Sequence, residues 1–221
     1  MPQKTPTTGQ CALCGNEFSK RMMTTHLASC DKRSVKKKAG SAFHIIVEYP
    51  YNSRYWLHIE AASNATLRQL DDFLRDIWLE CCGHMSAFRI GDQGYSAPQA
   101  IVETGDRNMN IRLDAVLIPD LTFQYEYDFG STTELVLSVL SQGDPKTAER
   151  VALLARNSAP VFPCIQCKKE ATDLCVDECL WENGPEGAAL CKKCSREHKC
   201  DKEMRLPIVN SPRTGVCGYE G

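Results

Sequence analysis

The spacing of apolar and polar residues predicts a β-rich region in the middle of the chain, with one amphipathic helix. Segments with strand composition lie at 43–49, 55–59, 87–90, 121–127, 134–141 and 150–156. After the second segment, apolar residues recur at helical spacing, at Leu67, Leu70, Phe73, Leu74, Ile77 and Trp78. Thr66 and Gln69 have the spacing of a capping box, which starts a helix. Strands outnumber helices and follow short connections, so we expect an α+β fold, with a mixed or antiparallel sheet and a packed helix.

Charge and cysteine content divide the chain into three segments. Residues 1–40 hold eight Lys or Arg against two Asp or Glu, residues 41–158 nine against sixteen, and residues 159–221 nine against ten. The net charges are therefore +6, −7 and −1, and the 13 cysteines fall three, two and eight. We expect a finger with a basic linker over 1–40, an acidic α+β domain over 41–158, and a cysteine-rich module with a tail over 159–221.

The sequence also bears on where the protein acts. No apolar run approaches the roughly 20 residues that span a bilayer, and the first residues lack the apolar stretch of a signal peptide. We therefore expect a cytoplasmic protein with no membrane partner. In a reducing compartment the cysteines would bind metal, whereas the alternative, a disulfide scaffold, needs an oxidising compartment.

The first three cysteines and one histidine have the spacing of a tetrahedral zinc site, Cys11-x2-Cys14-x11-His26-x3-Cys30. A Cys-x2-Cys turn presents two thiolates, and His26 and Cys30, four positions apart, project from one face of a helix. The segment resembles a CCHC-type zinc finger. Phe18 and Met23 occupy the places where such a finger has its small core.

The finger admits two roles. Zinc can fold a segment of about 20 residues that would not fold without it. Alternatively, the finger and the basic run from Lys32 to Lys38 form an arm that contacts the phosphates of a nucleic acid.

The C-terminal segment supplies eight ligands in four pairs, Cys164-x2-Cys167-x7-Cys175-x3-Cys179-x11-Cys191-x2-Cys194-x3-His198-x-Cys200. This arrangement resembles cross-braced two-zinc modules such as B-box and MYND fingers. The resemblance implies two interleaved sites: Cys164, Cys167, Cys191 and Cys194 in the first, and Cys175, Cys179, His198 and Cys200 in the second. His198 and Cys200 are only two positions apart, so Cys217 could replace either of them.

The cysteine and histidine spacing at both ends of the chain thus predicts metal centres whose ligands are thiolates and imidazoles. Four protein ligands leave no position for a substrate or water, so the centres are expected to be structural. The expected cofactor is zinc, two or three ions for the whole chain. Iron could replace zinc at the all-cysteine site, because the ligand set admits both metals.

Three motifs in the middle segment resemble the plasmid pRiA4b ORF-3-like family. They are Thr66-Leu67-x2-Leu70 with its helix, His84-x3-Phe88, and Tyr125-x-Tyr127-Asp128-Phe129-Gly130. The resemblance covers about residues 41–158, and the C-terminal tail is similar to family members with a cysteine-rich end. It implies a fold class but no reaction, since the family has no established activity.

One short motif could instead belong to an enzyme. Cys81-Cys82-Gly83-His84 places thiols and an imidazole together after a helix, as a nucleophile and its base would be, and Asp128 could orient the imidazole. In the simpler interpretation a cysteine closes the buried helix face, Gly83 and His84 cap the helix end, and Asp128 bonds backbone amides in a turn.

These observations lead to three hypotheses about function. The first is a zinc-binding, non-enzymatic adaptor that contacts an unidentified protein partner through its zinc modules. The second is a protein that binds nucleic acid through its basic N-terminal arm. The third is an enzyme centred on Cys82 and His84.

Overall fold

The computed structural model describes residues 7–32 and 40–221, and the chain forms two compact units. Unit 1 contains the chain up to Asp76 together with His84–Ser158, and unit 2 contains Ile77–Gly83 and Ala159–Gly221. The expected boundary between residues 158 and 159 is also a boundary between these units. The expected N-terminal finger, by contrast, lies in unit 1 with the acidic domain.

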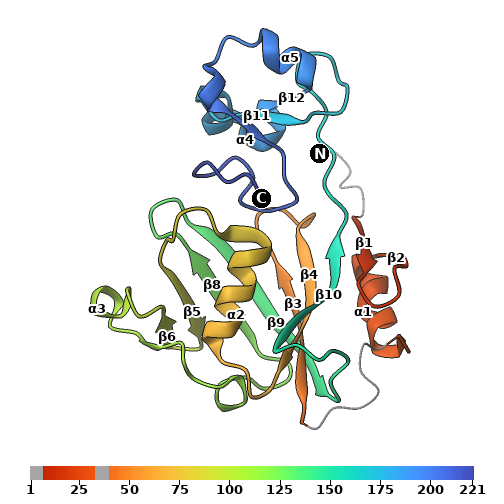
Figure 1. Ribbon diagram of the computed structural model, residues 1–221, viewed down its shortest axis with the longest axis vertical. Helices are drawn as coiled ribbons and strands as arrows, with labels where there is room; N and C mark the ends of the chain where they lie inside the picture. The colour runs from red at the N-terminus through yellow and green to blue at the C-terminus, as the bar shows by residue number, and fades with distance from the viewer. Residues whose placement is uncertain (1–6, 33–39) are drawn as a thin grey trace. The chain divides into compact units, whose positions relative to one another are not determined.

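Unit 1 is built on one ten-stranded mixed sheet (Figure 1). Its order is β2-β1-β10-β4-β3-β9-β8-β5-β6-β7, and all neighbours are antiparallel except β6 and β7. The strands are β1 Thr8–Cys11, β2 Glu17–Ser19, β3 Ala42–Glu48, β4 Trp56–Ala62, β5 Ser86–Ile90, β6 Gln93–Ser96, β7 Arg107–Asn108, β8 Thr122–Tyr127, β9 Thr133–Gly143 and β10 Val151–Asn157. The expected α+β class and all six expected strands are confirmed. The pattern missed β1, β2, β6 and β7, which are too short to show a period.

The helices of unit 1 are few and short. They are α1 Lys20–Ser29, α2 Leu67–Leu74, α3 Ile101–Thr104 and a 3₁₀ turn at Leu113–Ala115. Helix α2 lies across one face of the sheet (Figure 1), and its Leu67, Leu70 and Leu74 are fully buried. The expected capping box is present, because Thr66 Oγ1 accepts from Gln69 N and Gln69 Oε1 accepts from Thr66 N.

Helix α2 ends differently from the expectation. It passes into one π-helical turn, Arg75–Leu79, in which the chain leaves unit 1 for unit 2. The expected caps at Gly83 and His84 are wrong, since the helical segment ends four residues before Gly83.

The N-terminal finger joins the sheet through β1. This strand pairs with β10 in antiparallel register, Gly9 opposite Asn157 and Cys11 opposite Ala155. Met23 and Leu27 of α1 pack in one core cluster with Trp56, Leu154 and Ala155 of the sheet. The finger therefore shares its hydrophobic core with the middle domain instead of having a separate one.

Replacing Gly9 by alanine should loosen this junction. A Cβ at Gly9 would overlap the Arg156 carbonyl oxygen and the Trp56 ring, and strained packing of this kind costs about 1–3 kcal/mol. We expect a lower melting temperature for unit 1 and faster amide exchange in β1. Gly143→Ala is the matched control, because a Cβ there meets nothing within 4 Å. Equal exchange of β1 in the two variants would contradict the shared packing.

Two histidines face each other on neighbouring strands of the sheet. His44 Nε2 lies 2.9 Å from His58 Nδ1, and His58 is fully buried. Burial, and then the charge of Lys146, lowers the pKa of His44 to about 4. Burial, and then the charges of His44 and Lys20, lowers the pKa of His58 to about 3. Both imidazoles therefore stay neutral in the folded protein at pH values well below the ordinary histidine pKa.

This pair should make unit 1 sensitive to mild acid. Below the ordinary histidine pKa of about 6.5 the unfolded chain binds protons that the folded chain does not, so stability falls as the pH falls toward 4. Each imidazole contributes at most about 1.4 kcal/mol per pH unit. Urea unfolding between pH 7 and 5, with zinc in excess, should show a shallower pH dependence for His58→Asn than for the wild type. Equal slopes would show that the pair is not responsible.

Unit 2 contains a three-stranded sheet of order β12-β11-β13, with β11 Asp173–Cys175, β12 Ala189–Leu190 and β13 Arg205–Pro207. Its helical segments are α4 Glu178–Ala188, α5 Lys192–Glu197 and a 3₁₀ turn at Lys202–Met204. Helix α4 is broken at Gly184, which has a positive φ of 66° and precedes Pro185. No helix in the described ranges of either unit is long and apolar enough to cross a membrane.

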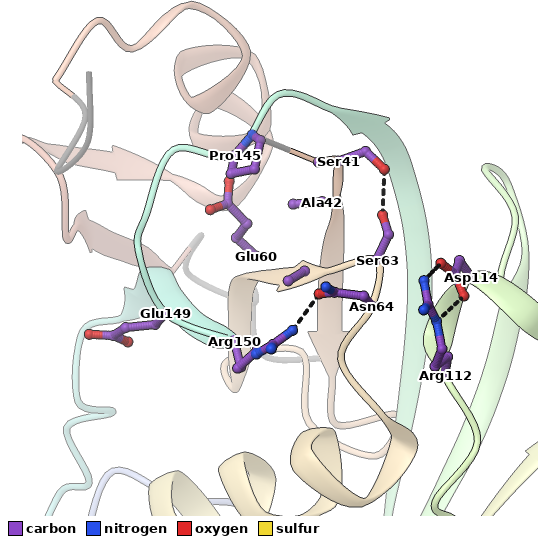
Figure 2. Close-up of a pocket in the computed structure, with 12 residues that line it drawn as sticks. Ser41, Ala42, Glu60, Ser63, Asn64, Arg112, Asp114, Pro145, Glu149 and Arg150 are labelled. Atoms are coloured by element: carbon purple, nitrogen blue, oxygen red, sulfur yellow. Dashed lines mark hydrogen bonds and ion pairs between the residues drawn. The ribbon is translucent and has the colours of Figure 1, made fainter. Parts of the chain in front are cut away.

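A hollow of about 330 Å³ lies at one end of the sheet of unit 1 (Figure 2). Its polar side chains bond to one another: Ser41 Oγ to Ser63 Oγ at 2.7 Å, and Arg112 to Asp114. Glu60 at its wall accepts from the backbone amides of Lys146 and Thr147 at 2.8 Å. The polar side chains around the hollow are therefore explained by hydrogen bonds that hold its walls together.

Candidate metal centres

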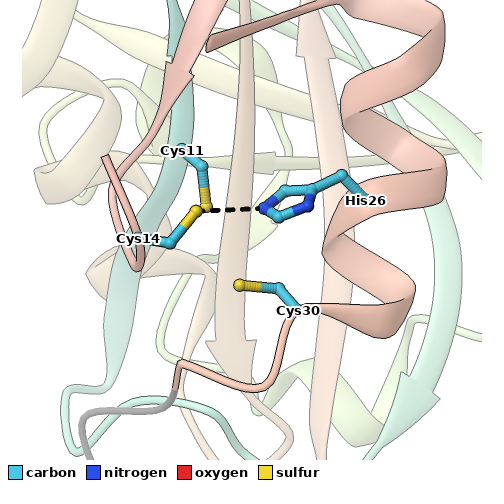
Figure 3. Close-up of side chains that lie close together, drawn as sticks. All are labelled: Cys11, Cys14, His26 and Cys30. Carbon is cyan, nitrogen blue, oxygen red and sulfur yellow. Dashed lines mark hydrogen bonds between the residues drawn. The ribbon is translucent and has the colours of Figure 1, made fainter. Parts of the chain in front are cut away.

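The first cluster lies between β1 and α1 (Figure 3). Cys11 ends β1, Cys14 follows in a tight turn, His26 is in the last turn of α1, and Cys30 is its C-cap. Their four donor atoms lie within 4.8 Å of one another, and Cys14 Sγ is 3.3 Å from His26 Nε2. Phe18 stacks on the His26 ring at 4.2 Å and orients it, and Met23 is fully buried below.

The backbone around this cluster favours thiolates. The amide of Asn16 lowers the pKa of Cys14 by hydrogen bonding. Burial raises the pKa of Cys11, although the amides of Cys14 and Leu13 oppose it. A bound cation would offset the burial cost, so the site fits a dication better than a set of neutral thiols.

The second cluster contains the four cysteines expected in the all-cysteine site. The sulfur atoms of Cys164, Cys167, Cys191 and Cys194 lie within 4.8 Å of one another, and Cys167 Sγ is 3.6 Å from Cys191 Sγ. Two come from a turn before β11, and two come from the N-cap and body of α5. The structure thus brings together the first and third pairs.

The thiols of this cluster differ sharply in acidity. Burial raises the pKa of Cys164, but the amides of Cys191, Cys167 and Gln166 outweigh it and lower the pKa to about 6. Burial and the neighbouring thiols raise the pKa of Cys194 to about 12. Without a cation the cluster cannot hold four thiolates, whereas zinc would lower the pKa of all four thiols at once.

The third cluster contains the remaining expected ligands. Donor atoms of Cys175, His198 and Cys200 lie within 4.8 Å of one another, and Cys179 Sγ lies 3.6 Å from His198 Nε2. Burial, and then contact with Cys200 and Cys179, raises the pKa of Cys175 to about 12. Cys217, offered above as a substitute ligand, is not in this cluster; its sulfur lies 3.7 Å from Cys82 Sγ.

Arg205 supports the third cluster, and sequence reasoning missed it. Its Nη2 donates to the carbonyl oxygens of His198 and Cys200, both at 2.8 Å, and its Nε lies 3.5 Å from Cys200 Sγ. Arg205 opens β13, which pairs with β11, so the sheet places the guanidinium beside the cluster. Hydrogen bonds from residues next to the ligands orient the metal ligands, but no local sequence motif predicts these bonds.

The donor sets fit zinc in chemistry and spacing. Sulfur and imidazole nitrogen are the ligands zinc prefers, and zinc–sulfur bonds of about 2.3 Å in a tetrahedron separate sulfur atoms by about 3.8 Å. The sulfur–sulfur distance of 3.6 Å in the second cluster is close to that value. The three Cys/His clusters can therefore hold metal ions, through the residues named for them.

The thiol and imidazole considered for catalysis have different surroundings from those of an activated pair. Contact with Cys81, then burial and Cys217, raises the pKa of Cys82 to about 12, which disfavours the thiolate at neutral pH. His84 Nε2 faces Asp128 at 3.4 Å. Asp128 Oδ1 accepts from the amides of Gly130 and Ser131, so the expected turn is confirmed.

The basic run that would contact nucleic acid falls mainly outside the described residues. Lys32 is described, whereas 33–39 are not. The nucleic-acid hypothesis therefore stays a prediction from sequence.

Comparisons with known proteins give a distant likeness to a solved structure. No protein-family model and no curated protein matches the chain. Among solved structures, the chain is similar to a protein of unknown function, MM3350, from Methanosarcina mazei Go1. The identity is 15%, the TM-score is 0.44, and the match covers 54% of this chain and 70% of that one.

Proposed function

We propose that this protein is a non-enzymatic adaptor whose three Cys/His clusters bind structural zinc and present surfaces to a protein partner. The observation that carries the proposal is the convergence of four thiol or imidazole donors in each of the first two clusters and of three in the third, where Cys179 lies beside His198. A site with four protein ligands has no position for a substrate. Zinc in such a site holds a fold in place, and the function then lies in the surface it supports.

The construction of unit 2 supports the adaptor role. Four of the five residues in the core cluster that contains Leu190 are cysteines, namely Cys164, Cys175, Cys191 and Cys194. Metal binding would thus fix the surface around one of the two core clusters of this unit; the other cluster is apolar, with Phe162, Leu174 and three alanines buried.

Metal analysis tests the first half of the proposal. Native mass spectrometry of the purified full chain should show at least one zinc ion fewer in each of Cys14→Ser, Cys191→Ser and Cys200→Ser. Lys193→Ser, an exposed change beside two ligands, should keep the wild-type count. A wild-type count that no ligand substitution lowers would refute structural zinc at these centres.

Co-purification of non-covalent complexes from cells that produce the protein tests the second half. We expect protein partners that survive nuclease treatment and high salt and that are lost from Cys191→Ser. Recovery of nucleic acid that is lost with rising salt, with no protein partner, would instead support the basic-arm hypothesis, because phosphate contacts weaken steeply with salt.

We also propose membership of the middle domain in the pRiA4b ORF-3-like family. The three motifs behind that resemblance meet in space. Tyr125 Oη donates to Asp71 of α2 at 2.7 Å, the Phe88 ring lies 4.7 Å from that of Tyr125, and the His84 ring lies 5.7 Å from that of Tyr127. These contacts support the proposal, because residues that pack together in one fold are expected to recur together in its family.

A further inference from the structure

Three cysteines that the centres above do not use lie together in unit 2. Cys82 Sγ is 3.5 Å from Cys81 Sγ and 3.7 Å from Cys217 Sγ, across 135 positions of sequence. All three sulfur atoms lie within 4.8 Å of one another. With this group, each of the 13 cysteines of the chain belongs to a cluster of possible metal ligands.

The sulfur spacing in this group is that of metal ligands. Two sulfur atoms bound to one zinc ion are separated by about 3.8 Å, whereas those of a disulfide are about 2.05 Å apart. The distances of 3.5 and 3.7 Å bracket the 3.6 Å found between Cys167 and Cys191 in the all-cysteine cluster. The sulfur–sulfur distances in this group thus match the distance in the all-cysteine cluster of the same chain.

The C-terminal tail is anchored so that Cys217 reaches Cys82. Ser211 Oγ donates to the carbonyl oxygen of Trp78 at 2.6 Å and accepts from the Arg213 amide at 2.9 Å. Cys217 has a positive φ of 51° and Gly218 one of 67°, which form a tight turn at the cluster. A non-glycine residue is uncommon in this conformation and costs about 1–2 kcal/mol.

A buried cation lies beside the group. Arg213 is fully buried, and its Nη2 lies 3.5 Å from Cys81 Sγ. A guanidinium beside sulfur favours the thiolate, which is the form that binds metal. A guanidinium nitrogen of Arg213 therefore contacts the Cys81 sulfur at the same distance, 3.5 Å, at which Arg205 contacts the Cys200 sulfur in the third cluster.

We infer that Cys81, Cys82 and Cys217 bind a further zinc ion, which fastens the C-terminal tail to the segment Ile77–Gly83. Each thiol releases its proton to solvent as its sulfur–zinc bond forms. Three thiolates occupy three positions of a tetrahedral zinc ion, and a water molecule can occupy the fourth. The inference adds a site outside the three proposed centres and holds whether or not the protein is an adaptor.

Substitution of Cys217 tests the inference without disturbing the fold. Glycine suits the positive φ of this position, so Cys217→Gly should form the same turn without backbone strain. It should carry one zinc ion fewer in native mass spectrometry, as should Cys82→Ser. Glu220→Gly, an exposed change in the same tail, should keep the full count.

Alkylation under reducing conditions gives a second readout for each cysteine. In the zinc-loaded full chain, iodoacetamide should label Cys82 and Cys217 about tenfold more slowly than after chelation, although both are exposed. Slow labelling of Cys191 in the same sample reports the all-cysteine centre, so failure of that centre and failure of this one are distinguishable.

Three results would overturn the inference. One is an unchanged zinc count in Cys217→Gly. Another is rapid labelling of Cys82 and Cys217 in the zinc-loaded chain. The third is recovery of these two residues as a disulfide from protein kept reduced throughout, which would assign the group to redox chemistry.

Discussion

Replacing Cys191 by serine should release the zinc ion of the all-cysteine centre and unfold unit 2, with loss of its other zinc ions, while unit 1 stays folded. Structural zinc in small modules contributes an apparent 10–16 kcal/mol or so at neutral pH, which matches or exceeds the entire stability of about 5–15 kcal/mol of a typical domain. Unit 2 has little to replace that contribution, since its sheet has three short strands, its apolar cluster is small, and the ligands themselves form its other core cluster. Small domains of this kind depend on metals or disulfides.

Hydrogen exchange with mass spectrometry measures this effect in each unit separately. Peptides within 159–221 should lose their protection in Cys191→Ser, and peptides from β3, β4 and β9 should keep theirs. Lys193→Ser, exposed on the same helix, is the control. Retained protection in unit 2 of a variant that has lost its zinc would show that the apolar core suffices, and the metal would then need another role.

Replacing Asp71 by asparagine should destabilise unit 1 by about 3–5 kcal/mol, the range for breaking one partner of a buried ion pair. Asp71 is fully buried on α2. Its carboxylate accepts from Tyr125 Oη and Ser86 Oγ, each at 2.7 Å, and from Arg75 Nε at 3.0 Å. Loss of its charge leaves the largely buried Arg75 guanidinium without its counter-charge.

The rest of this network is arranged around the same carboxylate. Arg75 Nη2 also donates to the carbonyl oxygen of His84 at 2.6 Å and to Ser86 Oγ at 2.8 Å, and its guanidinium lies 4.8 Å from the centre of the Tyr127 ring. Burial, and then the charge of Asp71, raises the pKa of Tyr125 well above its usual value. The phenol therefore stays protonated and donates to Asp71 at every pH at which the protein is folded.

The neighbouring residue offers a matched control for this prediction. Asp72 is exposed and pairs with Arg68 at 2.9 Å, one turn away on the helix. Exposed pairs at this spacing contribute about 0.3–0.5 kcal/mol, so Asp72→Asn should barely change the denaturant midpoint of unit 1. If Asp71→Asn and Asp72→Asn shift the midpoint equally, the buried network does not hold α2 on the sheet.

Local sequence rules accounted for six strands of unit 1, the start of α2 and the pairs of metal ligands that are neighbours in sequence. The capping box at Thr66 and Gln69 acts over three residues, so it can be read from a short window. The pairs Cys11 with Cys14 and Cys191 with Cys194 likewise lie within one turn of chain, and backbone geometry alone brings their sulfur atoms together. The pairing of distant knuckles came from resemblance to cross-braced modules, not from spacing.

Features that join distant segments could not be predicted in this way. The pairing of β1 with β10 makes the finger part of unit 1, yet a three- or four-residue strand carries no signal of its partner. Tyr125 meets Asp71 across 54 positions, and Cys217 meets Cys82 across 135. Such contacts depend on sheet register and on loop closure through the whole fold, whose energy is spread over many residues. The sequence supplied the ligands and the elements in their order, and folding selected which of them meet, because only packing of the complete chain brings remote side chains within bonding distance.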